Sequence, residues 1–364
     1  MKFKAVGSRF NEGLSRIKSV IRSSDALNPF ANVRVDTMGD SGVRLTATDG
    51  DIQIETTVFC DVFEQGACIV NGERLVSFSS STTIGQTEFS ADDKNFSMGN
   101  SGTQFRIRVG DVADFPEMHR PGVDACCVAI PSITLGEMLR KSVYAALTDK
   151  TRALLRGVNV CVKDGLVTMT ATDGRRLATV EHEVESEHDG DIIISSGTAK
   201  IVRGLCGTDG DVTIETDGKT VYIRGEQWCV TSKLIEDAYP NWRQVIPAAS
   251  TVPNVVHVCR ADFIRAIEQC ALADKDGNGV KLNVESGCIK FSAKSSVSSA
   301  TSFTTVKYDG PAIENKVNAQ LMVEALSCVD DDYVDLYLGA DSPACLVRCS
   351  VPYQAVVMFI RKDA

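Results

Sequence analysis

The sequence predicts an α+β fold built from three tandem similar domains. The first observation is a near-repeat of six residues, Leu-Thr-Ala-Thr-Asp-Gly at 45–50 and Met-Thr-Ala-Thr-Asp-Gly at 169–174, which lie 124 residues apart. The second observation is that Asp-Phe-Pro at 114–116 is echoed by Ala-Tyr-Pro at 238–240, at the same interval. Segments that recur in the same order and at one interval indicate a duplicated domain.

A fainter third copy follows the first two. Ser-Ala-Lys at 292–294 stands in the place of Thr-Asp-Gly, and Gln354–Ile360 parallels Gln104–Val109 and Gln227–Ser232. We therefore expect an N-terminal domain at residues 1–123, a central domain at 124–250 and a C-terminal domain at 251–364. Proline, glycine and small residues cluster near both joints, at 121–125 and 247–253.

Each domain is expected to hold two amphipathic helices among many antiparallel strands. Strands outnumber helices, which favours an α+β fold over an alternating βαβ sheet. Asp-Gly at 164–165 and 217–218 and Ser-Gly at 286–287 each separate two alternating runs and predict hairpins, because glycine accepts a positive φ. The predicted helical segments, in chain order, are Ser8–Arg22, Gly72–Ser81, Pro131–Asp149, Ser196–Cys206, Arg260–Ala273 and Lys316–Cys328.

The composition predicts a soluble globular protein. The chain has 364 residues, of which 43% are hydrophobic and 24% charged, so it is long enough for two or three cores and too apolar for disorder. It has no apolar run of eighteen residues, and Met1–Lys4 leads into alternating residues without the apolar segment of a signal peptide. The cytoplasm is therefore the expected compartment.

The cysteines are predicted to be buried, reduced thiols. The chain has 13 of them, mostly within apolar stretches, and no Cys-x-x-Cys pair. Cys345 and Cys349 have no second pair or histidines near them, so a zinc site is not expected. A cysteine-dependent enzyme stays open as a third hypothesis, which rests only on the number of thiols.

No set of catalytic residues is apparent. Gly218-Lys219-Thr220 resembles the end of a phosphate-binding loop, but Thr213 stands where that loop needs a glycine. The four histidines have no metal-binding spacing. Asp49 and Asp173 are expected to turn the backbone at a strand end, and the acidic run at 330–332 is expected to be a solvated turn. The sequence therefore predicts a protein that is not an enzyme and has no cofactor or metal.

Several motifs are similar to one family. The stretch 171–178, Ala-Thr-Asp-Gly-Arg-Arg-Leu-Ala, together with Thr231–Ile235 and Tyr239–Arg243, resembles the β subunit of bacterial DNA polymerase III, the sliding clamp. The opening Met-Lys-Phe and the ending Val356–Arg361 also look like that family. The resemblance covers the whole chain.

The resemblance implies a processivity factor. Two copies would form a head-to-tail homodimer that closes into a six-domain ring, with helices lining the hole and duplex DNA passing through it independently of sequence. Its implied partners are the polymerase III alpha subunit, the clamp loader, and other polymerases and repair proteins that carry clamp-binding peptides. The alternative is a clamp-like three-repeat scaffold that binds proteins without encircling DNA.

The distribution of charge agrees with a hole that is lined by helices and holds DNA. The six helical segments hold twelve basic and seven acidic residues, which gives them a net charge of +5. Since the whole chain has a net charge of −10, the rest of the chain carries −15. A mildly basic lining inside an acidic exterior attracts phosphates to the hole alone. The residues expected to face DNA are Lys18, Arg22, Arg140, Lys141, Lys200 and Arg203, with Lys150 and Arg152 at the face of the ring.

The resemblance also implies a peptide-binding groove between the second and third domains. Its residues would be Leu155, Thr172, Gly174, Arg175, Arg176, Leu177, Pro240, Val245, Val356, Met358, Phe359, Ile360 and Arg361. Apolar side chains supply shape for leucine and phenylalanine anchors, and methionine repacks around different partners. Arg175, Gln244 and Phe359 depart from the common histidine, arginine and proline of the family, so partner preference is expected to differ.

The contact between subunits is expected at an edge strand. The resemblance places it at Gln104–Arg108 of the first domain and at the helix end near Leu272 of the third. Phe105, Ile107 and Leu272 would form its apolar centre. An alternating edge strand is an aggregation hazard unless it is paired, which favours its burial in a dimer.

Overall fold

The computed structural model consists of two compact units. The first comprises residues 1–136 and 200–234, and the second comprises residues 137–199 and 235–364. The division falls inside two helices, so the predicted domain boundaries at 123/124 and 250/251 stay predictions. The described residues are 1–22, 28–81, 84–100, 102–116, 126–149, 152–186, 189–207, 209–248, 250, 252–274 and 279–360, without the side chains of 126 and 127.

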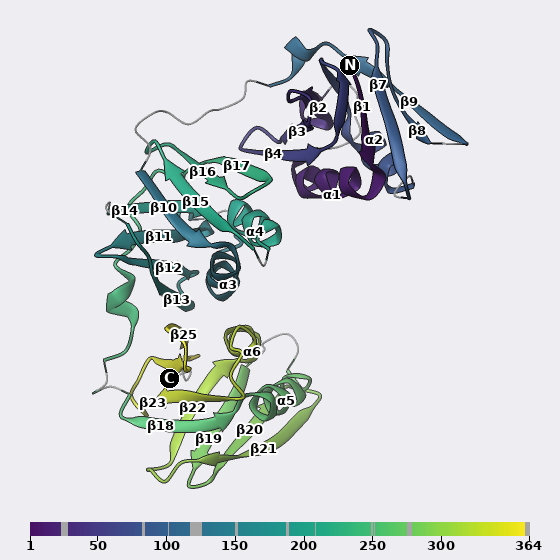
Figure 1. Ribbon diagram of the computed structural model, residues 1–364. Helices are drawn as coiled ribbons and strands as arrows, with labels where there is room; N and C mark the ends of the chain where they lie inside the picture. Colours follow the sequence, from purple (N-terminus) through teal and green to yellow (C-terminus); the bar gives the residue numbers. More distant parts are fainter. Residues whose placement is uncertain are drawn as a thin grey trace. The chain divides into compact units, whose positions relative to one another are not determined.

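The first of three repeats begins with a strand and a helix, and its elements are seen in Figure 1. A second helix separates its two groups of later strands. In chain order the elements are β1 (Lys2–Val6), α1 (Gly7–Ile17), β2 (Asn32–Thr37), β3 (Gly42–Thr48), β4 (Ile52–Phe59), β5 (Asp61–Glu64), β6 (Ala67–Asn71), α2 (Gly72–Ser81), β7 (Gln86–Ala91), β8 (Asn95–Asn100) and β9 (Thr103–Gly110).

The other two repeats have the same order of elements without the short β5. The second comprises β10 (Cys126–Pro131), α3 (Ser132–Val143), β11 (Gly157–Lys163), β12 (Leu166–Thr172), β13 (Arg176–Glu183), β14 (Gly190–Ser195), α4 (Ser196–Leu205), β15 (Asp211–Thr216), β16 (Thr220–Arg224) and β17 (Trp228–Lys233). The third comprises β18 (Asn254–Cys259), α5 (Arg260–Ala271), β19 (Gly279–Glu285), β20 (Cys288–Lys294), β21 (Ser299–Lys307), β22 (Ile313–Asn318), α6 (Ala319–Ser327), β23 (Tyr333–Leu338), β24 (Ala344–Arg348) and β25 (Tyr353–Met358). The predicted α+β class with three similar repeats is confirmed.

One continuous antiparallel sheet forms the frame of each unit. In the first unit the strand order is β10-β15-β16-β17-β4-β3-β2-β6-β9-β8-β7-β1-β5, and in the second it is β14-β11-β12-β13-β25-β24-β23-β18-β21-β20-β19-β22. Successive repeats are therefore joined by strand pairing, β4 with β17 in the first unit and β13 with β25 in the second. The last strand of one repeat completes the sheet of the repeat before it.

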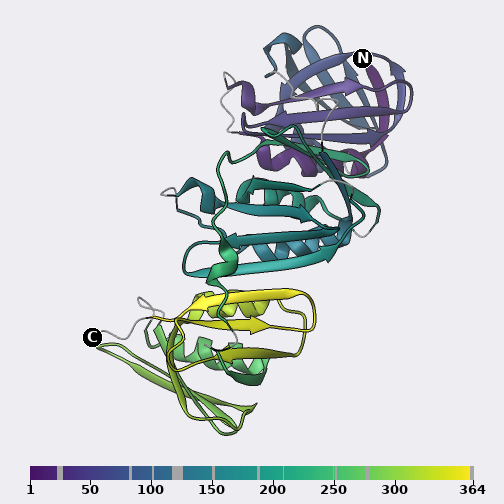
Figure 2. The same cartoon turned by 90° about the vertical axis from the view of Figure 1, so that its left-hand side faces the viewer.

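The helices pack through the apolar stripes that the sequence predicts. In α1 the buried residues Phe10, Leu14 and Ile17 recur at helical spacing and contact the sheet of the first repeat. Figure 2 shows this helix, in purple, against the strands of its own repeat. In the second unit α5 and α6 lie side by side, and Phe263 of α5 meets Phe291 of β20 edge-on, with ring centres 5.0 Å apart.

Some predicted helix bounds were wrong by a few residues. The first helix ends at Ile17 and continues as a 3₁₀ turn, and α3 ends at Val143. The last helix begins at Ala319 rather than at Lys316, because Ile313–Asn318 is strand β22. The Asn318 side chain then caps α6 by accepting a hydrogen bond from the Leu321 N–H at 3.1 Å.

The Thr-Asp-Gly tripeptide is a structural turn. Asp173 Oδ1 accepts hydrogen bonds from the backbone N–H groups of Arg175 (2.8 Å) and Arg176 (3.0 Å), and Thr172 Oγ1 accepts one from Gly174. Residues 48–52 and 216–220 form the same set of bonds. Gly174 has a φ of +85°, which favours glycine. The structural interpretation of the two aspartates is confirmed, and 216–218 is a third copy that the repeat interval did not reveal.

Replacing Asp217 with alanine is expected to destabilise the protein by about 1 kcal/mol, because two backbone N–H groups lose their acceptor. Thermal unfolding should show a Tm lower by about 2–4 °C. Asp217→Asn keeps the acceptor oxygen and serves as the control. An unchanged Tm for the alanine variant would contradict this role.

The effect should also depend on pH. Burial alone would raise the pKa of Asp217, but the N–H groups of Lys219 and Thr220 donate to it and lower the pKa below its ordinary value. A carboxylate whose pKa is lowered on folding stabilises the fold above the unfolded pKa. The difference in the free energy of unfolding between the wild type and Asp217→Ala should therefore be largest at neutral pH and shrink as the pH falls below about 4.

Candidate functional site

Three of the peptide-site residues predicted from the sequence meet in one apolar cluster in the second unit. Leu177 of β13 and Val356 of β25 face each other across the strand pair, and both are fully buried. Met358 packs against them and is partly buried. The structure therefore brings these three predicted residues together.

Several members of this cluster were not predicted from the sequence. Trp242 is 7% exposed in the 3₁₀ turn Trp242–Val245, and it shares the cluster with Ala344 and Leu346 of β24. Tyr239, Ile246 and Tyr337 pack against its edge. The available signal was the aromatic residue two positions after Pro240, whereas the β24 residues are brought in only by strand pairing.

The accessible members of the predicted site are distinct from this buried cluster, and we call them the exposed layer. Val245 is 48% exposed, and Gly174, Arg175 and Pro240 are also exposed. The Arg175 carbonyl accepts a hydrogen bond from the Met358 N–H at 2.9 Å, which fixes the turn against β25. Leu155 is 5% exposed and belongs with the buried layer. A ligand would meet the exposed layer before it could reach Leu177, which is fully buried.

Arg176 is held by its own chain. Its guanidinium forms an ion pair with Glu324 of α6 and donates from Nη2 to the Tyr144 carbonyl at 2.7 Å. Its Nε lies 3.2 Å from Asp173 Oδ2 without the alignment of a hydrogen bond. The side chain is 10% exposed. Arg176 therefore fixes β13 to α6, and its role in contacting a partner stays a prediction.

A tyrosine pair continues this connection. The hydroxyls of Tyr144 and Tyr353 lie 2.8 Å apart, and Tyr353 donates to the Ala325 carbonyl of α6 at 3.0 Å. Burial raises the pKa of both phenols well above the ordinary value, so both stay neutral. The strands β13 and β25, which carry the predicted site, are thus joined to α6 by neutral and charged hydrogen bonds.

The last described residues are tied to neighbouring segments. The Phe359 N–H donates to the Pro343 carbonyl at 2.9 Å, and the Ile360 N–H donates to the Lys316 carbonyl at 2.7 Å. Both side chains are half-buried, and Thr172 is also half-buried, with its hydroxyl bonded to the Arg176 carbonyl at 2.6 Å. Arg361 lies outside the described residues.

The residues predicted to face DNA fall into two groups. Lys18 follows α1, and Lys200 and Arg203 lie on α4, and all three are exposed. Arg22 is 58% exposed and pairs with Asp49 at 2.9 Å. Arg152 is exposed, with its guanidinium beside Gly174, and Lys150 lies outside the described residues.

Arg140 and Lys141 are engaged inside the second unit. Arg140 donates to Glu137 at 2.6 Å and to Asp330 at 2.9 Å, and Lys141, 7% exposed, lies 3.3 Å from Asp330. The hydrogen bond to Glu137 raises the pKa of Arg140. A DNA contact by either residue would compete with these carboxylates.

The acidic run at 330–332 serves the fold. Besides these pairs of Asp330, Asp331 accepts from the Ser350 N–H at 2.7 Å and hydroxyl at 2.8 Å, which lowers the pKa of Asp331. Among the described residues no group of three or more His, Cys, Asp or Glu is placed to hold a metal ion.

Gly218-Lys219-Thr220 lies at a hairpin turn between β15 and β16, as the sequence predicts. This is not the strand-to-helix loop that cradles phosphate.

Several of the described thiols are poor nucleophiles. Burial raises the pKa of Cys345 to about 12 and that of Cys206 to about 11. A thiol with a raised pKa is protonated at neutral pH and reacts slowly. These cysteines therefore give no support to a cysteine-dependent enzyme.

The predicted contact residues between subunits lie in strand β9 and at the end of helix α5. Phe105 of β9 stacks on Phe78 of α2 with ring centres 4.4 Å apart, and Ile107 is 4% exposed. In the second unit Leu272, at the end of α5, is 67% exposed, and Phe303 of β21 is 74% exposed.

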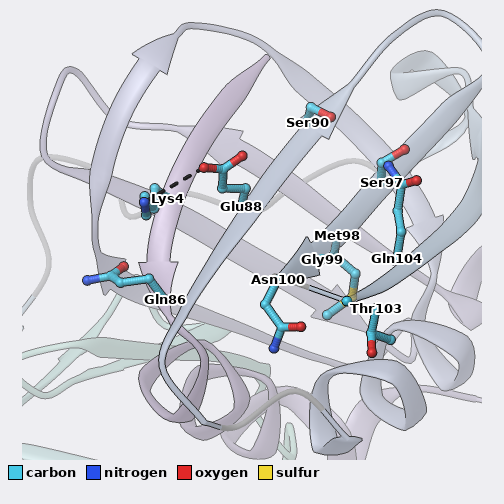
Figure 3. Close-up of a pocket in the computed structure, with 11 residues that line it drawn as sticks. Lys4, Gln86, Glu88, Ser90, Ser97, Met98, Gly99, Asn100, Thr103 and Gln104 are labelled. Atoms are coloured by element: carbon cyan, nitrogen blue, oxygen red, sulfur yellow. Dashed lines mark ion pairs between the residues drawn. The ribbon is translucent and has the colours of Figure 1, made fainter.

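An open cavity of about 830 Å³ lies on the outer face of β1, β7, β8 and β9 in the first unit (Figure 3). The figure shows Lys4 and Glu88 directed toward each other, with Nζ and Oε1 3.7 Å apart. The rest of its lining consists mainly of amides, hydroxyls and glycine. Its one acid and one base are paired with each other, so this cavity holds no catalytic arrangement among its lining residues.

Comparison with known proteins identifies the family. Residues 1–119 match the model of the DNA polymerase III beta subunit N-terminal domain, and residues 129–241 match that of its central domain. The beta sliding clamp of Chlamydia pneumoniae is 25% identical over 99% of both chains, and that of Treponema pallidum is 25% identical over 81% of this chain and 80% of its own.

Solved structures agree with this assignment. A sliding clamp from Bartonella birtlesii, solved bound to griselimycin, has 25% identity and a TM-score of 0.92 over all of both chains. The beta subunit from Thermotoga maritima has the same fold, with 20% identity and a TM-score of 0.90 over all of both chains. No helix in the described part of the chain is long and apolar enough to span a membrane. The chain belongs to the DNA polymerase III beta subunit family, the beta sliding clamps.

Proposed function

We propose that the protein acts as a processivity clamp, in which two copies close head to tail around duplex DNA. In this role the ring is not an enzyme: it tethers a polymerase by topology and presents a docking site for its partners. The proposal places the protein in the cytoplasm with the DNA and needs no cofactor. The observation that supports this role is that each unit has one strand edge without a pairing partner among the described residues. By their place in the repeats, these two edges correspond to strands that pair with each other where successive repeats are joined.

The two edges correspond to the strands that join successive repeats. Within the described residues, β9 pairs with β8 on one side and with β6 only at Val109 and Gly110 on the other, so residues 103–107 have a free edge. Likewise β21 pairs with β20 along one side and with β18 only at Val306 and Lys307. By repeat order β9 is the counterpart of β17 and β25, and β21 is the counterpart of β4 and β13.

The repeat also predicts the register in which β9 of one copy would pair with β21 of the other. Ala47, Ala171 and Ala293 are equivalent, and their strand partners are Ile54, Ala178 and Ala300. Ile54 in turn faces Val230, and Ala178 faces Ala355. The turns at Asp92 and Asp217 accept equivalent hydrogen bonds from the N–H groups of Asn95 and Thr220, so Met98 is equivalent to Ile223. Met98 pairs with Phe105 and Ile223 with Val230, so Phe105 is the counterpart of Val230. The matching of Gln104 with Gln227 expected from the sequence is therefore off by two residues. Ala300 of one copy should therefore face Phe105 of the other.

Side chains support this closure. By helix order Leu272 stands where the second repeat has Tyr144, which contacts β25 through Tyr353 at the second junction. Leu272 would then reach the Phe78–Phe105 ring pair of the other copy. Two such contacts close a ring, because heterologous contacts close whenever the rotation between copies permits. The scaffold alternative lacks an explanation for these complementary edges.

Replacing Phe105 with arginine should prevent closure, because a charge would enter the proposed strand pair and remove the aromatic stack. Light scattering at micromolar concentration should give a mass of about two chains of 39.2 kDa for the wild type and of one chain for Phe105→Arg. Phe63→Arg, at a residue that is 63% exposed in the same unit, is the control and should stay dimeric. A monomeric wild type would contradict closure.

The ring should hold DNA by topology. Once a bacterial clamp loader has placed the protein on nicked circular duplex DNA, we expect it to remain through gel filtration at high salt. Linearising the DNA should release it, because sliding off an end breaks no specific contact. Equal retention on circular and linear DNA would contradict encirclement.

Peptide docking should depend on Met358, which is partly buried, and on the exposed layer of the predicted site. A labelled peptide with leucine and phenylalanine anchors should bind Met358→Ala about tenfold more weakly, since covering a methionine side chain contributes roughly 1.5–3 kcal/mol. Val245→Ala should weaken it less, and Val297→Ala, at a residue that is 91% exposed, is the control.

Leu177→Ala is a poor probe of docking. The fully buried leucine would leave a cavity that costs about 2–5 kcal/mol of stability, so lost binding would be ambiguous. Unchanged peptide affinity in Met358→Ala and Val245→Ala would overturn the assignment of the site while leaving ring closure intact.

A further inference from the structure

A small pocket in the first unit occupies the junction between the first and second repeats. Its volume is about 190 Å³. A water molecule takes up about 30 Å³ of the liquid, and sites for whole small molecules have roughly 300–1,000 Å³, so this pocket fits one side chain. Its lining residues are Phe30, Thr48, Gly50, Asp51, Ile52, Gln53, Pro116, Thr220, Thr231, Ser232 and Lys233. We call it the junction pocket.

The junction pocket is the repeat equivalent of the predicted peptide site. It follows the Thr-Asp-Gly turn of the first repeat, as the peptide site follows that of the second. Gln53 faces Thr231 across β4 and β17, in the place where Leu177 faces Val356. The Lys233 N–H donates to the Asp51 carbonyl at 3.3 Å, just as the Met358 N–H donates to Arg175.

The chemistry of the two sites differs. Where the peptide site has the apolar pair Leu177 and Val356, the junction pocket has Gln53 and Thr231, which are 3% and 4% exposed. The Gln53 amide donates to Glu55 Oε1 at 3.0 Å, so its orientation is fixed. Phe30 and Pro116 contribute apolar surface to the lining of the pocket. The pocket therefore suits a side chain with an apolar stem and a polar, uncharged end.

The charged residues at the rim of the junction pocket restrict which polar group of a ligand can bind there. Lys233 Nζ lies 3.3 Å from Asp51 Oδ1, and these side chains are 60% and 76% exposed. An ion pair this exposed contributes little to stability, so it opens at small cost. A carboxamide offers an acceptor to the lysine and donors to the aspartate. A carboxylate would be repelled by Asp51, and an ammonium group by Lys233.

We propose that the junction pocket is a second binding site, which takes the carboxamide side chain of a glutamine or asparagine in an extended partner segment. The proposal does not depend on ring closure or on docking at the peptide site. It assigns two recognition sites of different chemistry to one repeated framework. The probe that tests it is acetyl-glutamine methylamide.

The test is methyl NMR on the full-length protein labelled at the isoleucine and methionine methyl groups. Ile52 lines the junction pocket, and Met358 reports on the peptide site. Acetyl-glutamine methylamide should shift the Ile52 signal saturably in the millimolar range, since a ligand of this size gains roughly 0.3 kcal/mol per atom. The Met358 signal should stay in place. The absence of a saturable shift at Ile52 would overturn the proposal.

Two variants of exposed rim residues sharpen the test. Lys233→Met should weaken the probe about fivefold to tenfold, because a charged hydrogen-bond donor is lost. Lys163→Met, at another exposed lysine, is the matched control and should leave the affinity unchanged. Asp51→Asn should admit acetyl-glutamate methylamide, which the wild type rejects. Equal binding of the two probes by the wild type, or no effect of Lys233→Met, would overturn the proposal.

Discussion

One backbone interaction organises this protein, the antiparallel pairing that joins each repeat to the next. The strand after the Thr-Asp-Gly turn of one repeat always receives the last strand of the following repeat, β4 with β17 and β13 with β25. Register fixes which residues share a face, because a shift by one residue reverses every side chain. The pairing therefore decides that Leu177 meets Val356 and that Gln53 meets Thr231, and both proposed binding sites follow from it.

The repeated junction has diverged in chemistry while its backbone stayed constant. The second junction buries Leu177, Trp242 and Val356 beneath an exposed layer that suits apolar anchors. The first places amides and hydroxyls at the same positions, beneath an exposed ion pair. At the two ends of the series, β9 and β21 keep edges that are free among the described residues, and a second copy would pair with them in the proposed ring. One framework thus accounts for partner docking and for closure.

The sequence predicted what is local and repeated. The Thr-Asp-Gly turns, the hairpins and the six helices follow from turn chemistry and periodicity. The repeat interval revealed the first two copies, and the order of segments revealed the third. The sequence did not reveal which apolar residues a strand pair would bury. Leu177 was expected at a ligand surface but is fully covered, and Ala344 and Leu346 enter the cluster only through β24. Arg140 and Lys141 are basic residues on a helix, yet Asp330, distant in sequence, engages both.

In the proposed ring, the register of the internal junctions also governs the contact between copies. The most direct measurement is disulfide cross-linking of a chain that carries Phe105→Cys and Ala300→Cys, since facing residues of an antiparallel pair lie about 4.5–5.5 Å apart, within disulfide reach. Mild oxidation should give a covalent dimer on a denaturing gel. The wild type, Phe105→Cys alone, and Phe105→Cys with Phe303→Cys should not. Equal cross-linking of the off-register pair, or none of the predicted pair, would contradict the account.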